Sequence, residues 1–99
     1  MLYVTQLIYI KPGKENIFDE FEQIAIPIIR NYNGKLLLRS RPTHTLESTI
    51  DPPYEIHLVE FNSESDLENF MQDEERKKFI HLKEESIEKV VLYVGRKYN

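Results

Sequence analysis

Short apolar runs alternate along the chain with segments whose apolar residues recur at spacings of three and four. Runs rich in β-branched and aromatic residues are typical of strands, and three- and four-residue spacing is typical of helices. The pattern predicts strands at 2–10, 35–41, 54–61 and 88–97. It predicts helices at 14–32, 63–72 and 74–86. With the last two taken as one bent helix, the order is strand, helix, strand, strand, helix, strand.

Local signals set several boundaries within this pattern. Ser63, with Asp66 three residues later, has the spacing of a capping box, so a helix should begin there. Pro27 lies inside the first helix, and because proline removes a helical hydrogen bond, we expect a kink or break near residues 23–27. Gly34 follows that helix and is predicted to take the left-handed conformation that ends it.

The predicted order of elements is that of the ferredoxin-like βαββαβ fold. This fold is of the α+β class and has a four-stranded antiparallel sheet with both helices on one face. A chain of 99 residues is expected to form one domain, residues 1–99. The helix-free face would carry Tyr3, Leu7 and Tyr9. Because monomers rarely leave such a surface in water, we expect a homodimer in which two sheets pack together about a two-fold axis.

Composition excludes several other classes of protein. The chain has 13 Lys and Arg against 17 Asp and Glu, a net charge of −4, and no dense basic run, so no nucleic-acid partner is expected. It has no cysteine, which excludes disulfides and a thiolate nucleophile. The three histidines are far apart and lack metal-ligand spacing, so no metal site is predicted. No apolar run approaches the roughly 20 residues of a membrane span, and a cytoplasmic protein with no membrane partner is expected.

Several short motifs, spread over nearly the whole chain, occur in the same order and spacing in a known group of proteins. They are Tyr32-Asn33-Gly34, Leu46-Glu47, Pro53, Glu60-Phe61 and Gly95. In order and spacing they resemble the dimeric α+β barrel superfamily and, within it, a small uncharacterised bacterial family, a domain of unknown function. The chain departs from that family at Asn33 and Ser48, where the family usually has glycine, and near Arg76, where it usually has an aromatic residue. The resemblance implies the ferredoxin-like fold and dimerisation.

The wider superfamily includes cofactor-independent antibiotic-biosynthesis monooxygenases and haem-degrading monooxygenases, whose sites lie between sheet and helices. Resemblance to the first implies a small-molecule-binding protein without a cofactor, in which a substrate activated by proton removal reacts with oxygen. The haem-degrading type has Asn, Trp and a ligand His at the positions nearest Gln6, Phe70 and His81, and only the histidine is kept. Haem binding through His81 is one alternative, and a non-enzymatic dimerisation or regulatory module is another.

His57 is the candidate catalytic base. If Phe61 faces the helices, the two-residue period of a strand places His57 on the same face, where a neutral imidazole could accept a proton. The structural alternative is a core histidine bonded to a neighbour. Gln6, Phe21 and Phe70 are expected to complete a pocket between sheet and helices.

Charged residues supply the remaining candidates. Arg39 and Arg41 share a strand face, and Arg39 could hold the carboxylate of a small aromatic or acidic ligand. Alternatively, the two arginines pair with Glu55, Glu60 or Glu47. Glu60, at the end of its strand, is predicted to face either the pocket or the subunit interface.

Overall fold

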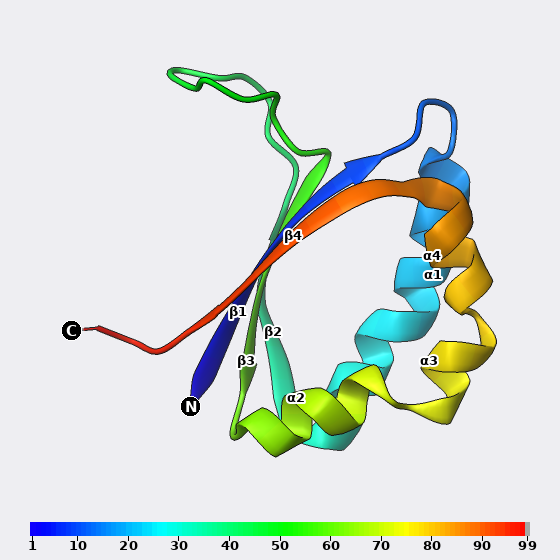
Figure 1. The fold of residues 1–99 in the computed structure, drawn as a ribbon, viewed down its shortest axis with the longest axis vertical. Helices are drawn as coiled ribbons and strands as arrows, with labels where there is room; N and C mark the ends of the chain where they lie inside the picture. Colours follow the sequence, from blue (N-terminus) through cyan, green and yellow to red (C-terminus); the bar gives the residue numbers. More distant parts are fainter. Residues whose placement is uncertain (99) are drawn as a thin grey trace.

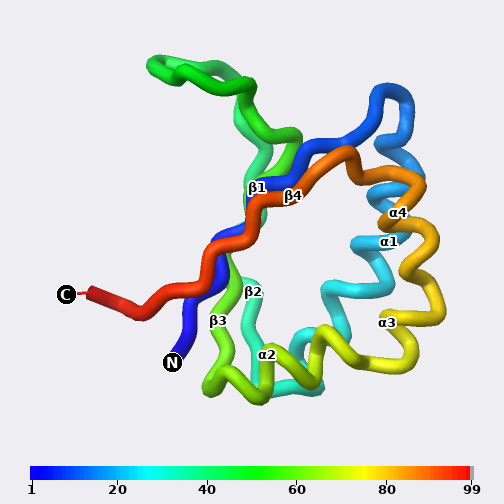
Figure 2. Tube along the Cα trace, viewed as in Figure 1, coloured from blue at the N-terminus to red at the C-terminus, as the bar shows by residue number. Residues whose placement is uncertain are grey.

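A computed structural model, which describes residues 1–98, contains one sheet of four strands. They are β1 (Leu2–Ile10), β2 (Gly34–Ser40), β3 (Glu55–Phe61) and β4 (Ile87–Gly95). Their order across the sheet is β2-β3-β1-β4, and every neighbouring pair is antiparallel. Figure 2 shows the C-terminal strand returning beside the N-terminal one, as their pairing requires. The predicted ferredoxin-like topology is confirmed.

All helices lie on one side of this sheet (Figure 1). They are α1 (Glu15–Ile28), the 3₁₀ turn η1 (Ile29–Tyr32), α2 (Glu64–Met71), α3 (Glu74–Lys78) and α4 (Ile80–Ser86). The long loop between β2 and β3 and the C-terminal segment extend on the other side of the sheet (Figure 1). Within residues 1–98, no helix combines the length and the apolar character that crossing a bilayer would need.

Side-chain caps divide the second helical region. Ser63 Oγ accepts a hydrogen bond of 3.2 Å from the backbone N–H of Asp66, as the predicted capping box requires. Asp73 Oδ1 accepts one of 2.8 Å from the N–H of Arg76 and begins α3. Each cap satisfies a backbone donor that the first helical turn leaves free. The region predicted as a helix over 74–86 is interrupted at Phe79, so α3 and α4 are separate.

Pro27 does not end α1 where the sequence suggested. The helix runs through Pro27 to Ile28 before it tightens into η1. Proline leaves the carbonyl of Gln23 without its helical partner, but Gln23 and Pro27 are both exposed. Because that carbonyl lies on the solvent side, water can satisfy it and the helix continues.

The left-handed residue after η1 is Asn33, with φ 58°, and the expectation that Gly34 would take this role is wrong. Asparagine is among the few residues that adopt this conformation readily. Gly34 begins β2 instead, and a glycine is needed there because the close packing leaves no room for a side chain. A Cβ atom there would lie 2.4 Å from Ile29 Cγ2 and 2.7 Å from Phe61 Cε1.

Replacing Gly34 with alanine should therefore destabilise the fold by about 2 kcal/mol, because neighbours in a packed core must shift to admit the methyl group. Chemical denaturation of the variant would measure this loss. Gly95→Ala is the matched control, since a Cβ atom at Gly95 would meet nothing within 4 Å. Equal stability of the two variants would contradict the packing role of Gly34.

The helix-facing side of the sheet is apolar at one end and charged at the other. Along β3, every second side chain is buried: Glu55, His57, Val59 and Phe61. Phe61 and Val59 pack with Val4, Ile29 and Phe70 in the main core cluster. Glu55 and His57 continue the same row, so the strand carries an acid and a base into the space beneath the helices.

Candidate functional site

A cavity of about 70 Å³ lies between the sheet and the helices. Its wall is mainly apolar, with aromatic side chains from α1, β3 and α2. Its polar side chains come from five elements: Gln6, Glu22, His57, Arg76 and Lys83. Small-molecule sites usually combine an apolar wall with a few convergent polar groups, and this cavity has that character.

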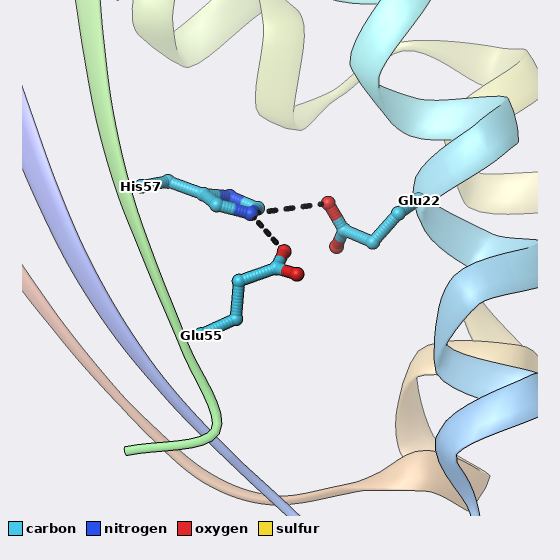
Figure 3. Close-up of side chains that lie close together, drawn as sticks. All are labelled: Glu22, Glu55 and His57. Atoms are coloured by element: carbon cyan, nitrogen blue, oxygen red, sulfur yellow. Dashed lines mark hydrogen bonds and ion pairs between the residues drawn. The ribbon is translucent and has the colours of Figure 1, made fainter. Parts of the chain in front are cut away.

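A buried acid–base cluster adjoins this cavity, and two of its three members, Glu22 and His57, line it. Glu22 on α1 and Glu55 and His57 on β3 converge beneath the helices (Figure 3). His57 Nε2–H donates a short hydrogen bond to Glu55 Oε2 and lies 3.6 Å from Glu22 Oε2. All three residues are buried, and Glu55 is fully so. A carboxylate that fixes one ring nitrogen of a histidine sets its tautomer and orientation.

Two arginines hold Glu55 in place. Arg39 Nε and Arg41 Nε each donate a 2.9 Å hydrogen bond to Glu55, one to each carboxylate oxygen. Arg41 also donates to Asp19 on α1 at 2.8 Å, and its guanidinium lies 4.6 Å from the ring centroid of Tyr54. This is the pairing with Glu55 that the sequence left open, although the carboxylate is buried rather than exposed. The cluster thus extends from solvent, at the arginines, to the cavity, at Glu22 and His57.

The environment shifts the pKa values of the three buried groups in different directions. Burial and the nearby charge of Glu55 raise the pKa of Glu22 to about 7. Burial would also raise the pKa of Glu55, but hydrogen bonds from Arg39, Arg41 and His57 outweigh it and lower that pKa below the ordinary value. Burial lowers the pKa of His57, which keeps the ring neutral near pH 7. Glu22 is therefore the group of the cluster that exchanges a proton near neutrality.

Donor atoms of Glu22, Glu55 and His57 lie within 4.8 Å of one another, which is close enough to consider a metal ion. Both oxygens of Glu55 already accept hydrogen bonds from guanidinium groups, which compensate its charge. A divalent cation would have to displace them and bear their repulsion. The arrangement therefore suits proton transfer better than metal binding.

A model of one protein family matches residues 6–96, nearly the whole chain. The chain belongs to the family described as Domain of unknown function (DUF1330). This agrees with the uncharacterised family that the sequence resembles. A search of curated proteins found no match.

Solved structures share the fold of this DUF1330 chain at low sequence identity. The RPA0582 protein of unknown function from Rhodopseudomonas palustris superposes with a TM-score of 0.83 at 9% identity, over 99% of this chain and 82% of that one. Protein Atu4242 from Agrobacterium tumefaciens gives 0.72 at 21% identity, over 99% and 94%. An uncharacterised NIPSNAP domain protein from Burkholderia xenovorans gives 0.75 at 15% identity, over 99% and 95%. These likenesses show the fold.

Four residues expected to form a pocket in this DUF1330 chain line the same cavity. They are Gln6, Phe21, His57 and Phe70. The period-two argument placed His57 on the helix-facing side, where it lies. Whether any of the four contacts a ligand stays a prediction.

Three other predicted site residues lie elsewhere. Arg39 is bonded to Glu55 and is not part of the cavity wall, so its proposed role as an anion anchor has no geometric support. Glu60 lies opposite Tyr3 in the pairing of β3 with β1, on the helix-free side of the sheet. His81 is exposed on α4, because its neighbour Leu82 takes the inward position. Haem ligation by His81 inside the cavity is therefore not supported by its position.

Sequence reasoning missed Glu22, Arg76 and Lys83. Glu22 follows Phe21 and falls within the apolar stripe of α1, so its inward position could have been read from helical spacing. Arg76 and Lys83 stand in runs of charged residues that suggested a solvated surface. Only the folded chain shows that they turn inward.

Proposed function

We propose that this DUF1330 protein binds a small, largely apolar molecule in the cavity beneath its helices and removes a proton from it. Glu22 is the proton acceptor, and His57, oriented by Glu55, is the second group that can take the proton. The proton leaves a C–H or O–H group of the substrate and forms an O–H bond on Glu22. This is also the first step expected of a cofactor-independent oxygenase.

One observation carries the proposal, namely the buried cluster of Glu22, Glu55 and His57, of which Glu22 and His57 line a mainly apolar cavity. A general base works best when its pKa is near the working pH, and the pKa of Glu22 is raised to about 7. Perturbed acids and bases that share a pocket are characteristic of functional sites. A dimerisation module would have no use for such a group.

The base can be tested without knowing the substrate. The probe is 1,2-benzisoxazole, a flat carbon acid whose N–O bond breaks when a base removes its C3 proton, giving 2-cyanophenolate, which is detected by its near-ultraviolet absorbance. We expect the protein to accelerate this reaction, with a rate that rises through about pH 7, where Glu22 loses its own proton. Glu22→Gln should lose about 100-fold of the protein-catalysed rate, since a positioned general base supplies at least that factor.

Glu20→Gln is the matched control, because Glu20 is exposed on the same helix. It should retain the full rate. His57→Gln separates the two candidate bases, since a larger loss there than in Glu22→Gln would make His57 the acceptor that the sequence suggested. If neither Glu22→Gln nor His57→Gln altered the rate, the proton-transfer proposal would be refuted.

We also infer that two copies of the chain pair through the helix-free face of the sheet. That face carries Leu38 and Tyr93, which are 52% and 63% exposed, and a shallow depression of about 460 Å³ next to β4. The β2–β3 loop and the C-terminal segment extend on the same side of the sheet (Figure 1). Covering an exposed apolar sheet face with its own copy needs only a two-fold axis.

Leu58 is the residue with which to test this pairing. It points to the helix-free side, opposite Thr5 on β1 and Leu38 on β2. Light scattering should give twice the mass of one chain for the native protein and the mass of one chain for Leu58→Glu, because the new carboxylate would be buried without a partner. Gln23→Glu, an exposed change on α1, should leave the mass unaltered. A native protein that is monomeric at micromolar concentration would refute the pairing.

A further inference from the structure

Arg76 is a cation buried in the cavity wall without a full set of partners. It is 7% exposed, and its Nε is enclosed with no hydrogen-bond partner. Its Nη1 donates only a 3.3 Å bond to the carbonyl of Met71, and the guanidinium lies 5.3 Å from the centroid of the Phe70 ring. Buried polar side-chain atoms almost always have a partner, so an orphaned guanidinium N–H beside a cavity needs an explanation.

Lys83 brings a second positive charge to the same cavity. Neither Lys83 nor Arg76 forms a salt bridge within residues 1–98. Burial lowers the pKa of both, and the charge of Arg76 acts further on Lys83. Glu22 is the acid of the cavity wall that attracts both cations, and it is partly protonated near neutral pH. The wall therefore has more positive than negative charge when no ligand is bound.

We propose that the ligand of this cavity is a small apolar monocarboxylate whose charged end is held by Arg76 and Lys83. The guanidinium of Arg76 and the ammonium of Lys83 supply donors for the carboxylate oxygens. The hydrocarbon body lies against Phe21 and Phe70. At about 30 Å³ of liquid volume per water, the cavity of about 70 Å³ corresponds to roughly two water molecules, which limits the ligand to a small acid.

The position of the anion also fits the proposed chemistry. Glu22 lines the same cavity as the two cations, so a carboxylate bound there would keep the substrate near the proton acceptor. Positive charge beside the substrate stabilises negative charge that develops when the proton leaves. The assignment rests on the proposed function only in taking the cavity to be a ligand site.

Benzoate and benzamide have the same shape and differ in charge, so they test the assignment directly. Their binding is followed by chemical shifts of backbone amides around the cavity. We expect the native protein to bind benzoate at least about 10-fold more tightly than benzamide, because hydrogen bonds to charged groups are the stronger ones. Arg76→Met and Lys83→Met should each reduce this preference at least about 5-fold while leaving benzamide affinity within about 2-fold.

Lys77→Met is the control, because it removes an exposed positive charge from α3 outside the cavity wall. It should keep the preference for benzoate. Lys83→Met keeps the test decisive if Arg76→Met does not fold, since Lys83 is only partly buried. Equal binding of the two probes, binding of neither, or a preference that survives both substitutions would overturn the assignment. If benzisoxazole still reacts in that case, only the proton-transfer proposal is supported. If benzoate is preferred but benzisoxazole does not react, only the anion site is supported.

Discussion

Replacing Glu55 with glutamine should lower the free energy of unfolding by about 3 kcal/mol at neutral pH. The carboxylate is fully buried and accepts hydrogen bonds from Arg39, Arg41 and His57. Glutamine keeps the shape but offers one acceptor and a new donor. At least one of the three donors then meets an N–H group instead of an oxygen, and the two guanidinium charges lose their buried counter-charge.

Urea denaturation of both proteins at one protein concentration would measure this loss. Glu84→Gln, an exposed change on α4, should alter stability by no more than about 0.5 kcal/mol. Because the pKa of Glu55 is lowered in the folded protein, its contribution exists above the unfolded pKa and disappears as the pH falls through the folded one. The variant should therefore be less sensitive to acid than the native protein. A loss no larger than that of the control would show that the arginines are satisfied without Glu55.

Much of this fold could be predicted because local sequence and tertiary structure agree. The strands are apolar enough to be recognised, and Ser63 marks the start of α2 by its spacing from Asp66. The predicted element boundaries that differ from the structure lie where tertiary contacts, rather than local sequence, determine the conformation. Gly34 is required by the closeness of Ile29 and Phe61, which are adjacent only after β2 has paired with β3.

The site was predictable only in part, for a related reason. Strand periodicity is strict, so one inward residue on β3 places the others, and His57 follows from Phe61. Charged residues on helices give no such signal, because lysine, arginine and glutamate usually face water. Arg76 and Lys83 lie on two short helices, α3 and α4, which are separated at Phe79, and both line the cavity. Their burial is a property of the assembled layers and not of the local sequence.

Glu22→Gln should behave in the opposite way to Glu55→Gln and stabilise the protein in alkaline solution. The pKa of Glu22 is raised from 4.5 to about 7 on folding, mainly because burial disfavours the charged form. Between these two pH values the unfolded chain has lost its proton while the folded one keeps it, so stability falls as the pH rises. Above about pH 7 the folded protein bears the full free-energy cost of keeping the buried carboxylate of Glu22 ionised. At 1.36 kcal/mol per pKa unit, it is about 3 kcal/mol.

Glutamine never ionises, so the variant should be more stable than the native protein by about 3 kcal/mol at pH 9 and equal to it near pH 4. The difference between the two proteins is the measurement, because the lowered pKa of His57 adds a pH dependence of the opposite sign to both. Denaturation curves at pH 4, 7 and 9 would give it. A constant difference across this range would mean that Glu22 does not titrate near neutrality. Stabilisation together with loss of the benzisoxazole reaction would instead show that the fold keeps a destabilising acid because the chemistry uses it.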